Sequence, residues 1–107
     1  MDLSNNTSLE YLNLSANQVS ALDLGKNQLL EYLDLSKNQI SVLDLSDNPQ
    51  LHTVYITEND FSGDELNKTF RSLHENLFKK SIGVRFNPGS DDCDLNIAIQ
   101  KGWHAWR

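Results

Sequence analysis

Apolar and polar residues alternate in short runs that recur every 21 residues along the first half of the chain. The window Leu9–Leu29 and the window Leu30–Gln50 are identical at 13 of 21 positions, and a third window from Leu51 keeps the apolar spacing. Each window contains an L-x-L pair, the period-two pattern of a short strand with one buried face. The repeat therefore predicts one coil of chain per window, each with a short strand. The residues expected to point inward from these strands are Leu12, Leu14, Leu33, Leu35, Val54 and Ile56.

An asparagine follows each L-x-L pair by three residues, including the second pair that lies in the other half of the first two windows. These asparagines succeed one another at spacings of 10, 11, 10 and 11 residues. A short amide can hydrogen-bond backbone groups inside a tight turn, where a longer side chain does not fit. A ladder of structural asparagines is therefore expected in the stacked turns. Its members are Asn17, Asn27, Asn38, Asn48 and Asn59.

These spacings resemble the leucine-rich repeat pattern L-x-x-L-x-L-x-x-N-x-L, at the short end of its range of lengths. The segments LDLGKN and LDLSDN resemble the second half of the nested 21-residue bacterial subclass called IRREKO. The resemblance covers residues 2 to about 61 and implies an α/β fold, a leucine-rich repeat solenoid with short parallel strands. A parallel β-helix with calcium-binding turns is the alternative, but the Gly-rich nonapeptide that such turns need is missing from the sequence.

After Asn59 the apolar spacing changes to a period of 3.6, which is typical of a helix with one apolar face. Ser62 and Glu65 form a capping box, so a helix is expected at about residues 63–80. Its apolar face would consist of Leu66, Phe70, Leu73 and Leu77.

Three further elements are expected between this helix and the end of the chain. Ile82, Val84 and Phe86 alternate with other residues and predict a strand, and NPG at 87–89 predicts a turn. A second helix, capped by Ser90 or Asp91, is expected at roughly 91–101, and WHAW at 103–106 predicts a closing strand.

The segments DELNKTFRSL, IGVRFNPGSDDCD and IAIQKGW resemble the C-termini of bacterial cell-surface proteins with these repeats. The resemblance implies that residues 62–107 form a capping region with the order helix, strand, helix, strand. Such a cap would close the apolar end of the repeats in residues 1–61, and the two parts would form one structural domain. Trp103 is expected to be a buried anchor of the cap, and Cys93 to be a buried apolar residue.

At the other end, the chain is expected to start inside a coil. Leu3 and Asn6 occupy the positions of Leu24 and Asn27, which leaves about 2.5 coils and no N-terminal capping segment. Because an uncapped end would expose leucines and strand edges, we expect either a longer natural chain or a homodimer that pairs through this end.

The charge of the chain differs between its two parts. Residues 1–60 hold nine Asp or Glu and two Lys, whereas residues 61–107 hold six Asp or Glu and seven Lys or Arg. The net charge of -6 argues against nucleic acid as a partner. No apolar run approaches the roughly 18 residues of a membrane span. The single cysteine excludes an internal disulfide.

The sequence contains no catalytic motif and predicts neither an enzyme nor a cofactor. Its three histidines are dispersed, and no G-x-S-x-G or phosphate-binding Gly-rich loop is present. Asp2, Asp23 and Asp44 recur every 21 residues and should stack outward at a strand spacing of about 4.8 Å. We expect them to form local hydrogen bonds with neighbouring Ser and Asn groups, and a calcium site is the alternative.

The exposed face of the strands is the predicted binding site. Stacking of the coils should place equivalent residues in three rows across this face. The first row is Tyr11, Tyr32 and Thr53, the middle row is Asn13, Asp34 and Tyr55, and the third row is Ser15, Ser36 and Thr57. Arg85 on the following strand would extend the middle row. Outward tyrosines beside small hydroxyl and amide groups suit recognition, because they combine rigid aromatic area with adaptable hydrogen bonding. The candidate binding residues are Tyr11, Asn13, Tyr32, Asp34, Thr53, Tyr55 and Arg85.

These features predict a non-enzymatic module that binds protein through the strand face. The alternatives are a carbohydrate-binding accessory module that uses the same tyrosines as stacking platforms, and a structural spacer or terminal cap of a longer surface protein. The family resemblance implies a bacterial cell-surface or secreted setting, although the sequence itself contains neither a signal nor an anchor. It does not identify the ligand.

Overall fold

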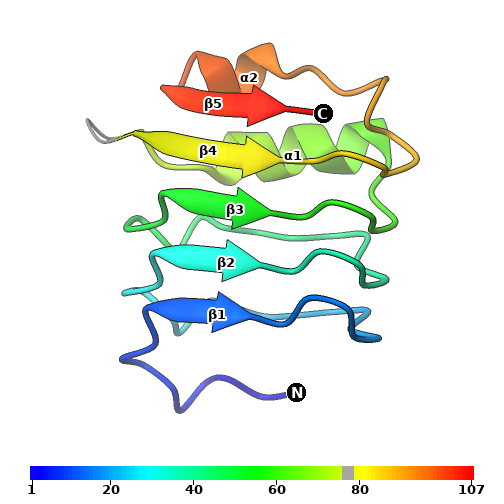
Figure 1. The fold of residues 1–107 in the computed structure, drawn as a ribbon. Helices are drawn as coiled ribbons and strands as arrows, with labels where there is room; N and C mark the ends of the chain where they lie inside the picture. The colour runs from blue at the N-terminus through cyan, green and yellow to red at the C-terminus, as the bar shows by residue number, and fades with distance from the viewer. Residues whose placement is uncertain (76–78) are drawn as a thin grey trace.

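Within the part of the chain that the structure describes, residues 1–75 and 79–107 of a computed structural model, five short parallel strands form one sheet in chain order (Figure 1). The strands are β1 (Tyr11–Asn13), β2 (Tyr32–Asp34), β3 (Thr53–Tyr55), β4 (Lys80–Gly83) and β5 (Trp103–Trp106). The helices are α1 (Gly63–Ser72) and α2 (Asn96–Ile99). This arrangement confirms the predicted α/β solenoid, which ends in the order helix, strand, helix, strand.

The register of the sheet follows the sequence repeat. Tyr11 pairs with Tyr32, and Tyr32 pairs with Thr53, so residues 21 positions apart lie side by side. The same rows continue into the cap, where Thr53 pairs with Ser81 and Ser81 with His104. Equivalent residues therefore form straight rows across the exposed face of the sheet.

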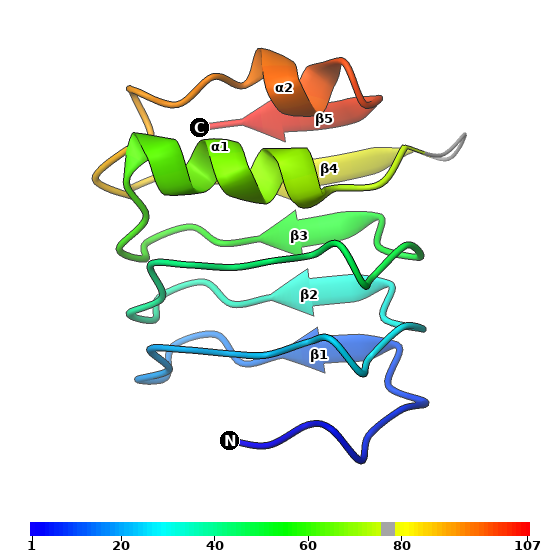
Figure 2. The same ribbon diagram turned by 180° about the vertical axis from the view of Figure 1, so that it is seen from behind.

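The buried face of the sheet packs against the returning half of each coil and, behind β4, against α1 (Figure 2). Leu33, Leu35, Val54 and Ile56 are all 0% exposed, as the alternation predicts. Burying one such side chain contributes roughly 1.5–3 kcal/mol. Leu14, the first-coil equivalent of Leu35, is only partly buried.

The predicted asparagine ladder is present inside the turns. The Asn59 amide nitrogen donates to the carbonyl of Leu35 in the preceding coil at 2.9 Å, and the Asn59 amide oxygen accepts from the backbone N–H of Ile40 at 3.0 Å. On the other side of the coil, Asn48 donates to the carbonyls of Leu24 and Asn27 at 3.0 and 2.8 Å. These amides tie each coil to the one before it, because they satisfy backbone groups that would otherwise be buried without partners.

Asn87 of the NPG segment extends this ladder into the cap, although the sequence pattern indicated only a turn there. Its amide nitrogen donates to the carbonyls of Ile56 and Val84 at 2.9 and 3.0 Å. Its amide oxygen accepts from the backbone N–H groups of Asn59 and Phe61, both at 3.1 Å. The cap is therefore joined to the repeats by the same interaction that joins the repeats to one another.

Helix α1 begins as predicted but ends earlier. Ser62 caps it by accepting from the backbone N–H of Glu65 at 3.2 Å, and the helix ends at Ser72 rather than near residue 80. Leu73 is extended, and its carbonyl accepts from the Lys101 side chain at 2.7 Å, which replaces the bond that a continuing helix would supply. The apolar face is buried at Leu66, Phe70 and Leu73, whereas the predicted fourth member, Leu77, lies outside the described residues.

The predicted strand 82–86 is wrong in its position, because β4 covers Lys80–Gly83. Ile82 and Val84 are buried as expected, but Phe86 is 62% exposed and has a φ of 62°. Ala16, Lys37 and Glu58 have the same left-handed conformation one residue before the turn asparagine. Phe86 thus occupies a turn position of the repeat, and its apolar character suggested a strand.

Helix α2 is also shorter than the predicted 91–101. It covers Asn96–Ile99, and its N-cap is Leu95, which makes no side-chain cap. Ser90 is not a cap, because its hydroxyl accepts from the backbone N–H of Asn87 at 2.8 Å and donates to the carbonyl of Val84 at 2.6 Å. These bonds support the turn that carries Asn87.

The predicted anchors of the cap are buried. Trp103 is 3% exposed, and its indole N–H donates to the carbonyl of His74 at 3.0 Å. Cys93 is 8% exposed, and burial raises the pKa of its thiol above the ordinary value. Neither helix among the described residues is long and apolar enough to cross a membrane.

Candidate binding face

Three tyrosines and a tryptophan form a continuous aromatic ridge, Tyr11–Tyr32–Tyr55–Trp106, on the exposed face of the sheet. The rings of Tyr11 and Tyr32 stack with centroids 4.2 Å apart and an angle of 3° between their planes. The rings of Tyr32 and Tyr55, and those of Tyr55 and Trp106, meet edge to face with centroids 6.0 Å apart. All four side chains point away from the core because they occupy outward positions of their strands.

The aromatic ridge crosses the strands diagonally. Tyr11 and Tyr32 belong to the first row of the face, whereas Tyr55 and Trp106 belong to the middle row. Between the latter two, the middle row contains Gly83 on β4. A Cβ atom at this glycine would lie 2.5 Å from the ring of Trp106. The glycine therefore lets the tryptophan lie over β4 and reach Tyr55.

Trp106 is a surface residue that the sequence analysis missed. The pattern WHAW predicted only a closing strand; in the structure Trp103 is buried, whereas Trp106 pairs with Gly83 in the middle row. The register needed to align Trp106 with Tyr55 depends on the length of the segment between β4 and β5, which does not follow the 21-residue period. A glycine in a predicted strand was the available signal, because such a glycine often marks the close approach of another group.

The prediction that Arg85 extends the middle row is wrong. Tyr55 pairs with Gly83, and the backbone N–H of Glu58 donates to the carbonyl of Arg85 at 2.8 Å, which aligns Arg85 with Thr57. Arg85 thus continues the third row, with its guanidinium 4.8 Å from the ring centroid of Phe86. The error follows from the misplaced strand.

The other predicted binding residues lie beside the aromatic ridge. Asn13 and Asp34 occupy the middle row, and their side chains accept from the backbone N–H groups of Ser15 and Ser36 at 3.0 and 2.9 Å. Thr53 follows Tyr32 in the first row and is partly exposed. These small polar groups border the rings without covering them.

The environment keeps the central tyrosine of the aromatic ridge in its neutral form. Burial, followed by a hydrogen bond with Tyr11 and the nearby charge of Asp34, raises the pKa of Tyr32 to about 12. At the adjacent edge, a hydrogen bond with Glu31 and repulsion from the same carboxylate raise the pKa of Glu10. Glu10 and Glu31 thus lie together as an acidic border beside the rings of Tyr11 and Tyr32.

The outward aspartates of the returning half-coils form local hydrogen bonds, as predicted. Asp2, Asp23 and Asp44 accept from the backbone N–H groups two residues further on, at 2.9, 2.8 and 2.9 Å. Hydrogen bonds with Ser4 and Ser46 lower the pKa of Asp2 and of Asp44. Within residues 1–75 and 79–107, no group of three or more His, Cys, Asp or Glu residues is arranged to hold a metal ion.

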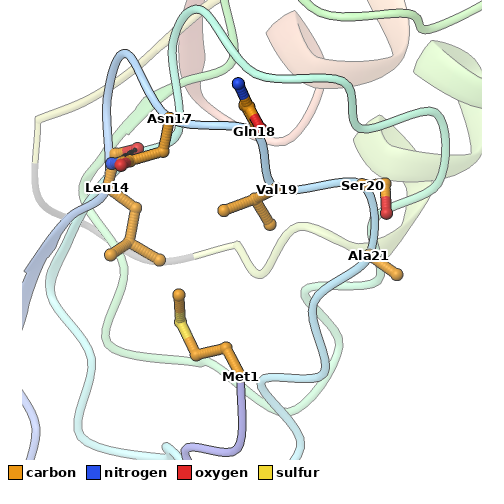
Figure 3. Close-up of a pocket in the computed structure, with 7 residues that line it drawn as sticks. All are labelled: Met1, Leu14, Asn17, Gln18, Val19, Ser20 and Ala21. Atoms are coloured by element: carbon orange, nitrogen blue, oxygen red, sulfur yellow. Dashed lines mark hydrogen bonds between the residues drawn. The ribbon is translucent and has the colours of Figure 1, made fainter.

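A hollow of about 430 Å³, lined by both apolar and polar side chains, lies between Met1 and the first full coil (Figure 3). Leu14 and Val19 point into it beside Met1. Their equivalents one coil later, Leu35 and Ile40, are 0% exposed because the preceding coil covers them. The hollow is therefore the stacking surface of a coil.

The comparisons with known proteins agree with this geometry. Residues 5–24 and 26–43 match a family model described as a leucine-rich repeat. The functional domain of InlJ from Listeria monocytogenes is similar over 92% of this chain and 20% of its own, with 26% identity and a TM-score of 0.70. An internalin, InlF, from the same species is similar over 97% of this chain and 29% of its own, with 19% identity and a TM-score of 0.75.

These similarities cover less than a third of either Listeria chain. The InlJ domain is described as including a cysteine ladder. Here the repeated turn residue is asparagine, and the sequence has one cysteine. No curated protein matches the sequence significantly.

Proposed function

Because the chain is a leucine-rich repeat protein of the bacterial kind, we propose that it is a non-enzymatic module that binds a protein partner on the aromatic ridge. The observation that carries the proposal is the unbroken contact of four outward aromatic side chains across five strands. Tyrosine and tryptophan dominate the energetics of many protein interfaces, since they bury a large area at a small cost in conformational entropy.

The surroundings of the aromatic ridge support a protein partner. Asn13, Asp34 and Thr53 provide a polar border next to the rings, and Arg85 adds a cation at the end of the third row. An aromatic centre with a polar rim is the usual anatomy of a protein interface. The candidate site therefore comprises the seven predicted residues together with Trp106.

The alternative, a carbohydrate ligand, fits the ring geometry less well. A sugar stacks on an open ring face, but one face of Tyr32 is covered by Tyr11, and the ring also meets Tyr55 at an angle of 72°. Tyr11, which is 60% exposed, is the ring with the most open surface. A glycan would thus use one end of the aromatic ridge rather than its length.

We propose that the protein acts at a bacterial cell surface or in the extracellular space, and its similarity to the Listeria internalins supports this location. A structural spacer or terminal cap of a longer surface protein is the alternative role. Pairing of two copies through the N-terminal coil is the alternative mode of assembly. In the spacer role the aromatic ridge would bind nothing, so the same binding experiment separates it from the proposal.

The proposal is tested with a phage-displayed library of random peptides, selected on the immobilised chain. Binders are then measured by calorimetry on the wild type and on the double variant Tyr32→Ala/Tyr55→Ala. We expect the double variant to lose at least about tenfold in affinity, or about 1.4 kcal/mol, because both changes remove central aromatic contacts. A glycan array probed with the same proteins tests the alternative.

Val42→Ala is the matched control, since Val42 is an apolar residue that is 60% exposed and belongs neither to the aromatic ridge nor to the other candidate site residues. It should leave peptide affinity unchanged, and far-ultraviolet circular dichroism should be the same for all variants. Peptides that bind the double variant as tightly as the wild type would remove the aromatic ridge from the site. Signal on the glycan array alone would favour the carbohydrate alternative.

A further inference from the structure

The diagonal course of the aromatic ridge leaves a cleft beside it, at the end of the sheet where β3, β4 and β5 begin. In the first row, the large rings of Tyr11 and Tyr32 are followed by the small side chains of Thr53 and Ser81, and then by His104. The resulting cleft has a volume of about 550 Å³. The residues that define this cationic cleft are His52, Thr53, Lys79, Lys80, Ser81 and His104.

The side chains along this edge of the sheet change from acidic to basic between the second and third coils. The residues that immediately precede the paired strand positions are Glu10, Glu31, His52 and Lys80, in spatial order. Lys79 adds a further cation at the cleft. An anionic group is therefore repelled at the first two coils and attracted at the cationic cleft, and the distance over which this contrast acts is short because exposed charges are screened within about 10 Å.

The cations of the cleft have different roles. Lys80 is 3% exposed, its ammonium group donates to the carbonyl of Lys101 at 3.2 Å, and it lies 5.5 Å from the centroid of the Trp103 ring. Burial lowers the pKa of Lys80, and the charge of Glu75 opposes this effect. Lys80 thus lies at the bottom of the cleft, where these contacts hold its side chain in place.

Lys79 and His104 are the exposed donors of the cleft. Neither side chain makes an ion pair or side-chain hydrogen bond with the residues described, 1–75 and 79–107. His52 is more constrained, because its Nδ1 atom is 2.8 Å from the Thr53 hydroxyl and its Nε2 atom is 3.9 Å from a Glu31 oxygen. An incoming anion would therefore be bound chiefly by Lys79, His104 and the hydroxyl of Ser81.

We infer that the cationic cleft receives the carboxylate of a Glu or Asp side chain from the protein that docks on the aromatic ridge. This inference rests on the proposed function and specifies the partner: an apolar or aromatic contact across Tyr32 and Tyr55 with an acidic residue next to it. A single carboxylate fits the charge pattern, since a polyanion that extended along the edge would approach Glu31 and Glu10. Glu10 and Glu31 would instead favour a basic group of the partner over the first two coils.

The test uses the full chain and two matched small probes, N-acetyl-glutamate N-methylamide and its glutamine counterpart. Nuclear magnetic resonance monitors the ring protons of His52 and His104 and the side chain of Lys79 during titration at constant pH and ionic strength. We expect saturable shifts at these residues with the glutamate probe and none with the glutamine probe. Lys79→Gln/His104→Gln should weaken glutamate binding by about tenfold, whereas Lys26→Gln, which removes an exposed cation elsewhere, should leave it unchanged.

The possible outcomes separate this inference from the proposed function. Tyr32→Ala/Tyr55→Ala should keep the response to the glutamate probe, so a failure of peptide binding on the aromatic ridge does not change this result. Equal shifts with both probes, or no shifts with either, would overturn the inference. A response to inorganic phosphate without a response to glutamate would also overturn it, because it would indicate a free-anion site.

Discussion

In the repeat segment, residues 1–61, β1 and β2 are each followed by an extended return along the back of the solenoid. At the back of the cap, residues 62–107, helices α1 and α2 take the place of this extended return, after β3 and β4 respectively (Figure 2). The front of the molecule does not change at this boundary. The strands keep their register through β5, and Asn87 repeats the bonds of Asn59. The cap therefore closes the core at the back of the solenoid while it continues the exposed strand face at the front.

The largest effect is expected when substitutions at the two ends of the core are compared by their free energies of unfolding. Phe70→Ala in α1 removes a side chain that is 0% exposed and should cost about 3–5 kcal/mol of unfolding free energy. Leu14→Ala at the open end should cost less than the roughly 2–5 kcal/mol of a buried leucine, because that side chain is already partly exposed. Urea unfolding measures both values, and equal losses would contradict the difference in burial between Phe70 and Leu14.

The asparagine ladder allows a sharper comparison of the two segments. Asn87→Ala leaves the buried backbone N–H groups of Asn59 and Phe61 without partners, at about 1–3 kcal/mol for each unsatisfied group. Asn17→Ala should cost below about 1 kcal/mol, because Asn17 is exposed and bonds only within its own turn. If the two variants unfold at the same urea concentration, Asn87 is not a member of the ladder.

The same comparison explains what could be predicted from sequence. In the repeats, each position is constrained by its equivalent 21 residues away, so the inward leucines, the strands and the asparagines were all correctly placed. In the cap no second copy exists to fix the register. Phe86 was therefore assigned to a strand although it occupies a left-handed turn, and Arg85 was assigned to the wrong row. The contribution of Trp106 to the exposed face was missed for the same reason. Trp106 lies beside Tyr55 only because β4 pairs with both β3 and β5 in this register, and no repeat in the sequence predicts that register.

A smaller effect is expected where the aromatic ridge crosses from the repeats into the cap. Gly83→Ala places a methyl group 2.5 Å from the Trp106 ring in its present position, so the ring must move away from Tyr55. We expect a loss of about 1–3 kcal/mol in unfolding free energy, as for other overpacked sites, and a changed near-ultraviolet circular dichroism spectrum. Ser81→Ala, in the same strand, should change neither. An unaltered spectrum in the Gly83 variant would mean that the ring contact does not depend on this glycine.

The smallest expected effect concerns the ionisation of the aromatic ridge within the repeats. The folded pKa of Tyr32 is raised from 10.0 to about 12, so the unfolded chain loses this proton first as the pH rises. The contribution of the protonated Tyr32 hydroxyl to the free energy of unfolding is therefore fully present below pH 10. It is lost as the pH rises toward 12, because over this range the folded state binds more protons than the unfolded state. Tyr32→Phe removes the titrating hydroxyl. The difference in unfolding free energy between wild type and Tyr32→Phe should consequently shift against the wild type over this range, as measured by urea unfolding at several alkaline pH values. Parallel curves for the two proteins would show that the Tyr32 hydroxyl titrates equally in both states, and that the contact with Tyr11 does not desolvate it.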